Sequence, residues 1–156
     1  MTTTESENVQ VEHPTRWVTF QLAGENYAIN VLTVHEVLKN AELTPVPGAP
    51  DAVLGIINLR GNVVTVIDGR RRFNLPSVPI TDATRTIVVE VDGQVLGLLV
   101  DSVAEVIELP AEQVAASPTV NSDDNAVHIQ GVVSRPGGLV ILLSLDNLTQ
   151  TIRLHA

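Results

Sequence analysis

Short runs of Val, Ile and Leu, separated by turn residues, form the hydrophobic pattern of this chain. The two most prominent runs cover residues 55–59 and 63–67, with Arg60, Gly61 and Asn62 between them. Branched apolar runs of this length around a short turn predict a tight β-hairpin, in which Gly61 and Asn62 supply the positive φ. Because the runs are nearly continuous, we expect both faces of the hairpin to be covered.

Other stretches predict further short strands. An alternating pattern begins at Trp17, turns at residues 23–26 and continues through residues 27–31, which predicts a second hairpin. Residues 34–38 are compatible with either a strand or a single helical turn, because the stretch is too short to show a period. Prolines interrupt the regular pattern before the hairpin of residues 55–67 and again in the connector at residues 74–83. Short helical turns are expected near Arg70 and at residues 145–148.

An internal repeat organises these elements. With an offset of 69, residues 17–37 align without a gap with residues 86–106, and with an offset of 76, residues 55–67 align with residues 131–143. The identities are few, but the order of hairpin, V-x-E-V step, proline-rich loop and hairpin is the same in both halves. The repeat predicts a duplication, with halves at about residues 17–82 and 83–150.

The predicted fold class is all-β, because short apolar strands dominate and helical signals are few. A duplicated set of about five strands indicates two small barrels packed together with a shared core. Residues 1–15 are polar and acidic, which predicts a disordered tail before a domain at residues 16–150. The chain shows neither a signal sequence nor an apolar run of about 20 residues, and it has no cysteine, so a cytoplasmic location is expected.

Charge is distributed unevenly along the chain. The net charge of −9 disfavours nucleic acid and anionic membranes as partners. Between residues 60 and 85, however, five arginines stand with two aspartates, a net charge of +3. This basic region coincides with the first hairpin and its exit, so it is either a solvated face or a docking site for an acidic protein surface.

The residues offer little for catalysis. The four histidines, at positions 13, 35, 128 and 155, lack the spacing of a metal site, and the acidic residues 123–124 lack the pattern of a calcium loop. Phosphate-binding and nucleophile motifs are absent. We therefore expect no enzyme activity, no cofactor and no metal.

The hairpin region carries a family resemblance. The segments P-G-A-P, G-I-I-N-L-R-G, V-V-T-V-I-D and R-R-R-F, with the later G-L-L-V-D-S-V-A-E-V, resemble the CheW family of bacterial chemotaxis coupling proteins over residues 17–148. Thr65 and Gly69 depart from the usual pattern. The resemblance implies two five-stranded barrels of the SH3 or OB kind that exchange segments. It also implies an adaptor that links methyl-accepting chemoreceptor tips to the regulatory domain of the histidine kinase CheA. Because the pattern predicts a self-sufficient double core and no long exposed apolar strand, we expect the free protein to be a monomer.

The resemblance also implies which residues contact the kinase or the receptor. They lie in the V-x-E-V step, in the first hairpin and in the second half: Val34, Glu36, Gly55, Asn58, Leu59, Arg60, Gly61 and Val103. Three of these have a structural explanation that stays open at this stage. Arg60 could pair with a carboxylate of its own chain, Glu36 could be the outward residue of a strand, and Gly55 could permit a bend.

Two other functions are compatible with parts of the pattern. The first is the coupling domain of a CheV-like protein or of another, non-motility signalling array, although no receiver domain follows. The second is an OB-type barrel that binds nucleic acid, which would need aromatic stacking platforms in a basic groove. With one Trp, one Tyr and two Phe in the chain, the aromatic residues are too few to favour it.

Overall fold

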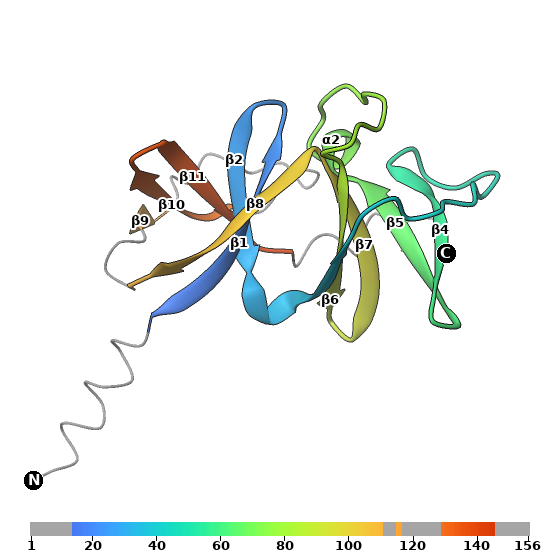
Figure 1. Cartoon of the computed structure of the whole chain (residues 1–156), viewed down its shortest axis with the longest axis horizontal. Coiled ribbons are helices and arrows are strands. Elements are labelled where there is room, and N and C mark those ends of the chain that lie inside the picture. The colour runs from blue at the N-terminus through green and yellow to red at the C-terminus, as the bar shows by residue number, and fades with distance from the viewer. Residues whose placement is uncertain (1–13, 111–114, 117–128, 146–156) are drawn as a thin grey trace, which may run out of the picture.

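The computed structural model describes residues 14–110, 115–116 and 129–145, and this part of the chain is almost entirely β-structure (Figure 1), which confirms the predicted fold class. The elements in chain order are β1 (Thr15–Leu22), β2 (Glu25–Asn30), the 3₁₀ turn η1 (Val31–Thr33), β3 (Val34–Leu38), β4 (Val53–Leu59), β5 (Asn62–Asp68), α2 (Gly69–Arg72), β6 (Arg85–Val91), β7 (Gln94–Val100), β8 (Ser102–Leu109), β9 (Ala115–Ala116), β10 (Ile129–Arg135) and β11 (Gly138–Leu143).

The strands form two sheets that lie side by side in Figure 1, with α2 near their junction. We call them sheet A and sheet B. Sheet A has the order β8-β1-β2-β11-β10-β9, and sheet B has the order β3-β6-β7-β5-β4. The short β9 pairs with β10 at the edge of sheet A, so five full strands remain in each sheet.

The two sheets repeat each other in register as well as in order, which confirms the duplication. The β1–β2 pair aligns Trp17 with Asn30, and the β6–β7 pair aligns Thr86 with Leu99, as the offset of 69 requires. Parallel pairing joins β2 to β11 in sheet A and β7 to β5 in sheet B. Even the register shifts recur, once where β1 meets β8 and once where β6 meets β3.

Each sheet draws strands from both halves of the chain. The β1–β2 hairpin of the first half lies in sheet A beside β8, β10 and β11 of the second half, and the β6–β7 hairpin of the second half lies in sheet B beside β3, β4 and β5. Because hairpins need only short turns, whole hairpins can be exchanged with little change in connection length. The chain crosses between the sheets after β2 and again after β7.

Hydrophobic packing follows the same plan. One large cluster of buried side chains combines β1, β2 and β11 of sheet A with β5, β6 and β7 of sheet B, and includes Phe20, Ile29, Ile67 and Leu98. A smaller cluster around Trp17 lies within sheet A, and another, around Val66, lies within sheet B. Each barrel therefore has a core of its own, and a shared core joins the two.

The structure also corrects or limits several expectations. Residues 34–38 form a strand, β3, which settles the choice between strand and helical turn. The base of the β4–β5 hairpin is buried, but its tip is exposed, with Val63 70% exposed. The expectation that both faces would be covered is therefore wrong at the tip, because β4 is an edge strand and β5 pairs with β7 only from Thr65 to Asp68.

The helical turn near Arg70 is present as α2, which begins after Asp68, the residue that caps it. Thr15 already belongs to β1, and the rest of the expected tail, residues 1–13, lies outside the described residues. The same holds for the acidic loop at residues 121–125 and for most of the turn expected at residues 145–148. In the described part of the chain, no helix is both long and apolar enough to cross a membrane.

Candidate partner-binding site

The tip of the β4–β5 hairpin is a two-residue turn made by Arg60 and Gly61. Both residues have positive φ, 52° and 90°, and Leu59 pairs with Asn62 across the turn. This is the pattern of a type I′ turn, whose twist suits a β-hairpin. The prediction that Gly61 and Asn62 supply the positive φ is therefore wrong by one residue, and Asn62 is the first residue of β5.

Asn58 explains why the turn settles in this register. Its side-chain oxygen Oδ1 accepts a hydrogen bond from the backbone N–H of Gly61 at 2.8 Å. A short polar side chain that bonds a backbone group a few residues ahead is a common device for fixing turns. Arg60 is held by this frame in the left-handed region, where a residue with a Cβ is uncommon.

The Arg60 side chain pairs with Glu36 of β3. Its Nη1 and Nη2 atoms both donate to Oε2 of the carboxylate, at 2.8 and 2.7 Å. The sequence left open whether Arg60 pairs with a carboxylate of its own chain. The structure shows that it does, and that the carboxylate is Glu36. The guanidinium nevertheless remains 67% exposed and the carboxylate 28% exposed, so the pair lies on the surface.

This ion pair joins the two edge strands of sheet B. β3 and β4 stand at opposite ends of the strand order, so the contact from the β4–β5 tip to β3 helps to close the sheet into a barrel. A backbone bridge joins Thr44, in the connector after β3, to Ile56 of β4, through hydrogen bonds of 2.8 and 2.9 Å. A partner that binds at Arg60 would thus contact the barrel at its closure.

Gly55 lies beside this backbone bridge. A Cβ atom at Gly55 would stand 2.3 Å from the backbone carbonyl oxygen of Thr44, and the φ of Gly55 is +156°. No side chain fits at that distance, so glycine is required here for the close approach of two backbones. The structure therefore gives Gly55 a packing role, and its contact with a partner stays a prediction.

The remaining predicted residues divide between the sheets. Leu59 is half-buried against the small cluster of Ile57, Val64 and Val66 in sheet B. Val34 on β3 and Val103 on β8 occupy equivalent positions in the repeat, and both pack against the shared core. The structure brings together Glu36, Asn58, Arg60 and Gly61 at one tip, whereas Val103 belongs to sheet A.

The basic region between residues 60 and 85 is largely neutralised by its own chain. Arg60 pairs with Glu36, Arg70 with Asp101 at 2.6 Å, and Arg71 with Asp51 at 2.7 Å. The hypothesis of a strongly positive docking patch is therefore weakened. The sequence alone could not reveal these ion pairs, because the carboxylates come from segments 20 to 31 residues away along the chain.

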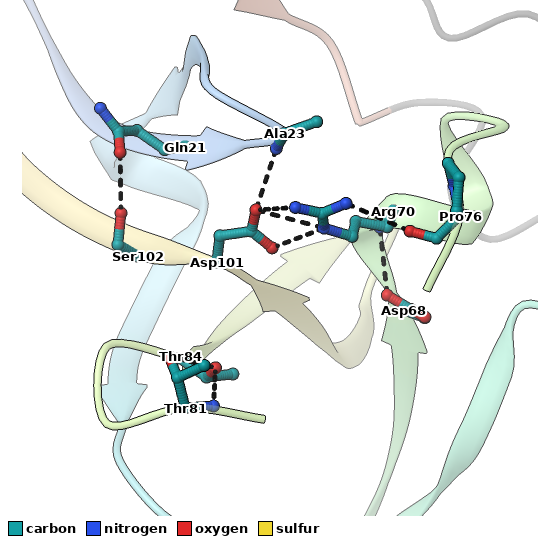
Figure 2. A network of polar contacts seen from close by, with 9 residues as sticks. All are labelled: Gln21, Ala23, Asp68, Arg70, Pro76, Thr81, Thr84, Asp101 and Ser102. Carbon is teal, nitrogen blue, oxygen red and sulfur yellow. Dashed lines mark hydrogen bonds and ion pairs between the residues drawn. The ribbon is translucent and has the colours of Figure 1, made fainter. Parts of the chain in front are cut away.

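Arg70 and Asp101 form a network that the sequence did not single out (Figure 2). Arg70 Nε and Nη2 donate to the Asp101 carboxylate, which also accepts the backbone N–H of Ala23 at 2.9 Å. These hydrogen bonds, from Arg70 above all, hold the pKa of Asp101 below its ordinary value. The available signal was an arginine run directly after a buried strand, and an aspartate directly after another.

Comparison with known proteins decides the family. The family model for the CheW-like domain matches residues 16–153. The chain belongs to the CheW family. Among curated relatives, the chemotaxis protein CheW of Bacillus subtilis is 34% identical over 131 residues, covering 84% of each chain. That of Rhizobium meliloti is 30% identical over 131 residues, with the same coverage.

A solved structure agrees with the family in three dimensions. The scaffolding protein TtCheW from Thermoanaerobacter tengcongensis superposes with a TM-score of 0.81 at 36% sequence identity, over 88% of this chain and 93% of that one. The CheW-family chain described here is accordingly a chemotaxis coupling adaptor built on a non-catalytic scaffold fold.

Proposed function

We propose that this CheW-family protein links the cytoplasmic tips of methyl-accepting chemoreceptors to the regulatory domain of the histidine kinase CheA. It acts in the cytoplasm and is a monomer when free. The observation that carries the proposal is the pair of equivalent but chemically different hairpin tips, one on each sheet. An adaptor must hold two partners at once, and a duplicated fold with diverged surfaces meets that need.

The β4–β5 tip is the surface that we assign to a partner through Glu36, Asn58, Leu59, Arg60 and Gly61. The turn is rigid, because Asn58 fixes it and Arg60 is anchored on Glu36. A guanidinium held in place loses little conformational entropy on docking and can still donate its remaining N–H groups to a partner carboxylate. The pair with Glu36 therefore orients Arg60 for binding.

Val34 on β3 and Val103 on β8 extend the proposed contacts to both sheets. Their positions are equivalent in the repeat, but the neighbouring tips differ, so we assign them to different partners. Gly55 contributes by shaping the backbone beside the first tip. Because the residues of each proposed surface lie on one sheet, a substitution in one surface should weaken the contact with one partner and leave the contact with the other partner intact.

The test is reconstitution of kinase control from purified parts. Receptor cytoplasmic fragments on vesicles, CheA and this protein are combined, and CheA autophosphorylation is followed with and without the protein. We expect activation only when all three are present, and a loss of most activation with Arg60→Ala. Arg16→Gln is the control, because it removes only a surface ion pair with Glu108 within sheet A.

Three outcomes would count against the proposal. Activation that does not require this protein would exclude the coupling role. A bacterial lysate pull-down that recovers a different kinase, and neither CheA nor chemoreceptor peptides, would favour another signalling array, and nucleic acid alone in the eluate would favour the OB-type alternative. For the oligomeric state, light scattering at micromolar concentration should give the monomer mass.

A further inference from the structure

Val103 lies near the beginning of β8, an edge strand of sheet A that pairs with β1. A register shift interrupts the pairing of β8 with β1. Beyond that shift, towards the start of β8, two pairs follow: Phe20 with Val103 and Gln21 with Ser102. Two residue pairs at the end of an edge strand give little local stability. The position of Val103 therefore depends on what holds the residue just before Ser102.

That residue is Asp101, which alone separates β7 from β8. Its carboxylate accepts Nη2 of Arg70 at 2.6 Å and the backbone N–H of Ala23 at 2.9 Å. Its own backbone N–H donates to the carbonyl of Gln21 at 3.0 Å. Figure 2 shows Arg70 and Asp101 facing each other. Because Arg70 follows β5 of sheet B, whereas Ala23 and Gln21 belong to the β1–β2 hairpin, Asp101 is fixed from both sheets.

The helical turn α2 holds Arg70 against the junction of the sheets. A Cβ atom at Gly69 would stand 2.6 Å from the backbone oxygen of Leu99 in β7 and 3.3 Å from the side chain of Leu22 in β1. Glycine therefore permits a close approach of α2 to a strand of each sheet. Nη1 of Arg70 also donates to the carbonyl of Pro76 at 3.2 Å, and only 16% of the Arg70 side chain is exposed. The guanidinium is thus bonded on two sides and largely enclosed.

Arg71, the next residue of α2, contacts a different part of the chain. Its Nη1 donates to the Asp51 carboxylate at 2.7 Å, just before β4, and its Nε donates to the Ser77 hydroxyl at 2.8 Å. The Asp51 side chain is 91% exposed, so this ion pair lies on the surface. Of two neighbouring arginines, one therefore holds the start of β8 and the other does not.

We propose that α2 is a positioning element for the partner surface at Val103. Arg70 holds Asp101, Asp101 fixes the start of β8, and the affinity for the partner at Val103 therefore depends on a largely enclosed arginine. Val103 is half-buried against the shared core, so a looser β8 would have to be ordered again when the partner binds, which costs affinity. The proposal rests on the function proposed above, in which Val103 and Arg60 contact different partners.

The first experiment follows amide hydrogen exchange by NMR in the free protein. The backbone N–H groups of Asp101 and Glu105 both donate to atoms of β1, at 3.0 Å. With Arg70→Gln we expect both amides to exchange at least about fivefold faster, and the Thr44 and Ile56 amides of the sheet B bridge to stay within about twofold of wild type. A general loss of stability would instead accelerate all four amides.

Arg71→Gln is the matched control, because it removes the same charge from the same helical turn and should leave the two β8 amides unchanged. Gly69→Ala is an independent variant: its Cβ should push α2 outward and accelerate the same two amides although Arg70 is kept. If Arg70→Gln does not fold, Asp101→Asn gives the same test with a side chain of nearly the same shape. Emission from buried Trp17 reports whether each variant keeps its fold.

The second experiment measures affinity by titration with the CheA regulatory domain and with a receptor cytoplasmic fragment. Val103→Ala and Arg60→Ala first identify which partner contacts each surface. We expect Arg70→Gln to bind the partner at Val103 at least about fivefold more weakly, and to bind the partner at Arg60 within about twofold of wild type.

Unchanged exchange of the β8 amides in both Arg70→Gln and Gly69→Ala would overturn the proposal, and so would equal acceleration in Arg71→Gln. Normal affinity of Arg70→Gln for the partner at Val103, an equal loss for both partners, or normal affinity of Val103→Ala for both would also overturn it. If the wild-type protein binds neither partner, the proposed function itself fails, which is visible without any variant. The exchange rates then decide alone whether α2 fixes β8.

Discussion

The two hairpin tips occupy equivalent positions in sheets A and B, yet their turns differ. At the β4–β5 tip, Arg60 and Gly61 both have positive φ. At the β10–β11 tip, the equivalent residues are Pro136 and Gly137, and the positive φ is found one residue later, at Gly138 with 126°. A proline cannot adopt the conformation of Arg60, because its ring fixes φ near −65°. The strands of the two hairpins pair in the same register, whereas the residues and the conformation of their turns differ.

The glutamates beside the tips show the same divergence. Glu36 holds Arg60, but no ion pair of its counterpart Glu105 is found among the described residues, since Pro136 stands where the arginine would be. The Glu105 backbone is instead fixed by the Thr19 hydroxyl, through two hydrogen bonds of 3.0 Å. Identical residues at equivalent positions of the repeat can therefore have different structural roles, and substitutions near the two tips can test this.

The largest effect is expected for Gly55→Ala. The new Cβ would overlap the Thr44 carbonyl, so the bridge between Thr44 and Ile56 must open. We expect a loss of about 3 kcal/mol or more in the free energy of unfolding, the range of severe single substitutions. Chemical denaturation measures this loss. Gly137→Ala at the other tip meets nothing within 4 Å and is the control; equal losses in the two variants would contradict the account of Gly55.

Arg60 gives the clearest contrast in binding. Arg60→Ala should weaken association with the kinase domain or the receptor tip at least about tenfold, in the range of interface hot spots, and Arg60→Asp should weaken it more. Stability should fall by only about 1 kcal/mol or less, the usual value of an exposed ion pair. Arg60→Gly suits the positive φ and should lose binding without any loss of stability.

Calorimetric melts and titrations with each partner decide between the roles of Arg60. Arg135→Ala, at the other tip, should leave the partner of the first tip unaffected. Large destabilisation with unchanged affinity would return Arg60 to a purely structural role in closing the barrel.

Val34 and Val103 sharpen the comparison between the sheets. Both are half-buried against the shared core, so Val34→Ala and Val103→Ala should each cost about 1 kcal/mol of stability. Their effects on binding should differ several-fold, one variant mainly losing the kinase and the other mainly the receptor. Parallel titrations against both partners measure this. Equal impairment of both contacts by both variants would rule out the two-surface account.

A smaller effect is expected within the turns. Gly61→Ala places a Cβ at φ +90° and should cost about 1 kcal/mol, the usual size of such backbone strain. Gly137→Ala has no such φ and should change stability by less than about 0.5 kcal/mol. Thermal unfolding of both variants checks the difference. Similar values would mean that the two turns are conformationally alike.

The smallest effect is expected in the dependence of stability on pH. Hydrogen bonds from Arg70 and Ala23 lower the pKa of Asp101 in the folded protein, so the carboxylate contributes stability above its unfolded pKa and loses it as pH falls below about 4. Asp101→Asn lacks this titration, and the stability difference between wild type and variant should shrink as pH falls through that range. A difference that grows with acidification would have the wrong sign.

Patterns in the sequence predicted the strands and their duplication, whereas the exchange of segments between the barrels was implied only by the family resemblance, and the contacts between distant side chains were not predicted. Branched apolar runs and the two offsets predicted the strands and the duplication, because strand formation and register depend on neighbouring residues. The turn at Arg60 was misplaced by one residue, since its register is set by the Asn58 side chain. The Arg70–Asp101 and Arg60–Glu36 pairs depend on tertiary folding, and no local pattern specifies which carboxylate an arginine will reach.

The exchange of hairpins between the sheets has a consequence for the two halves as separate molecules. If the chain were cut in the connector at residues 74–83, the first fragment would lack β6 and β7 of sheet B, and the second would lack β1 and β2 of sheet A. Neither fragment contains a complete barrel, so each would need the other as a folding template. When mixed, the two fragments should reassemble as a heterodimer. Deletion of either half from the chain would therefore disrupt both barrels.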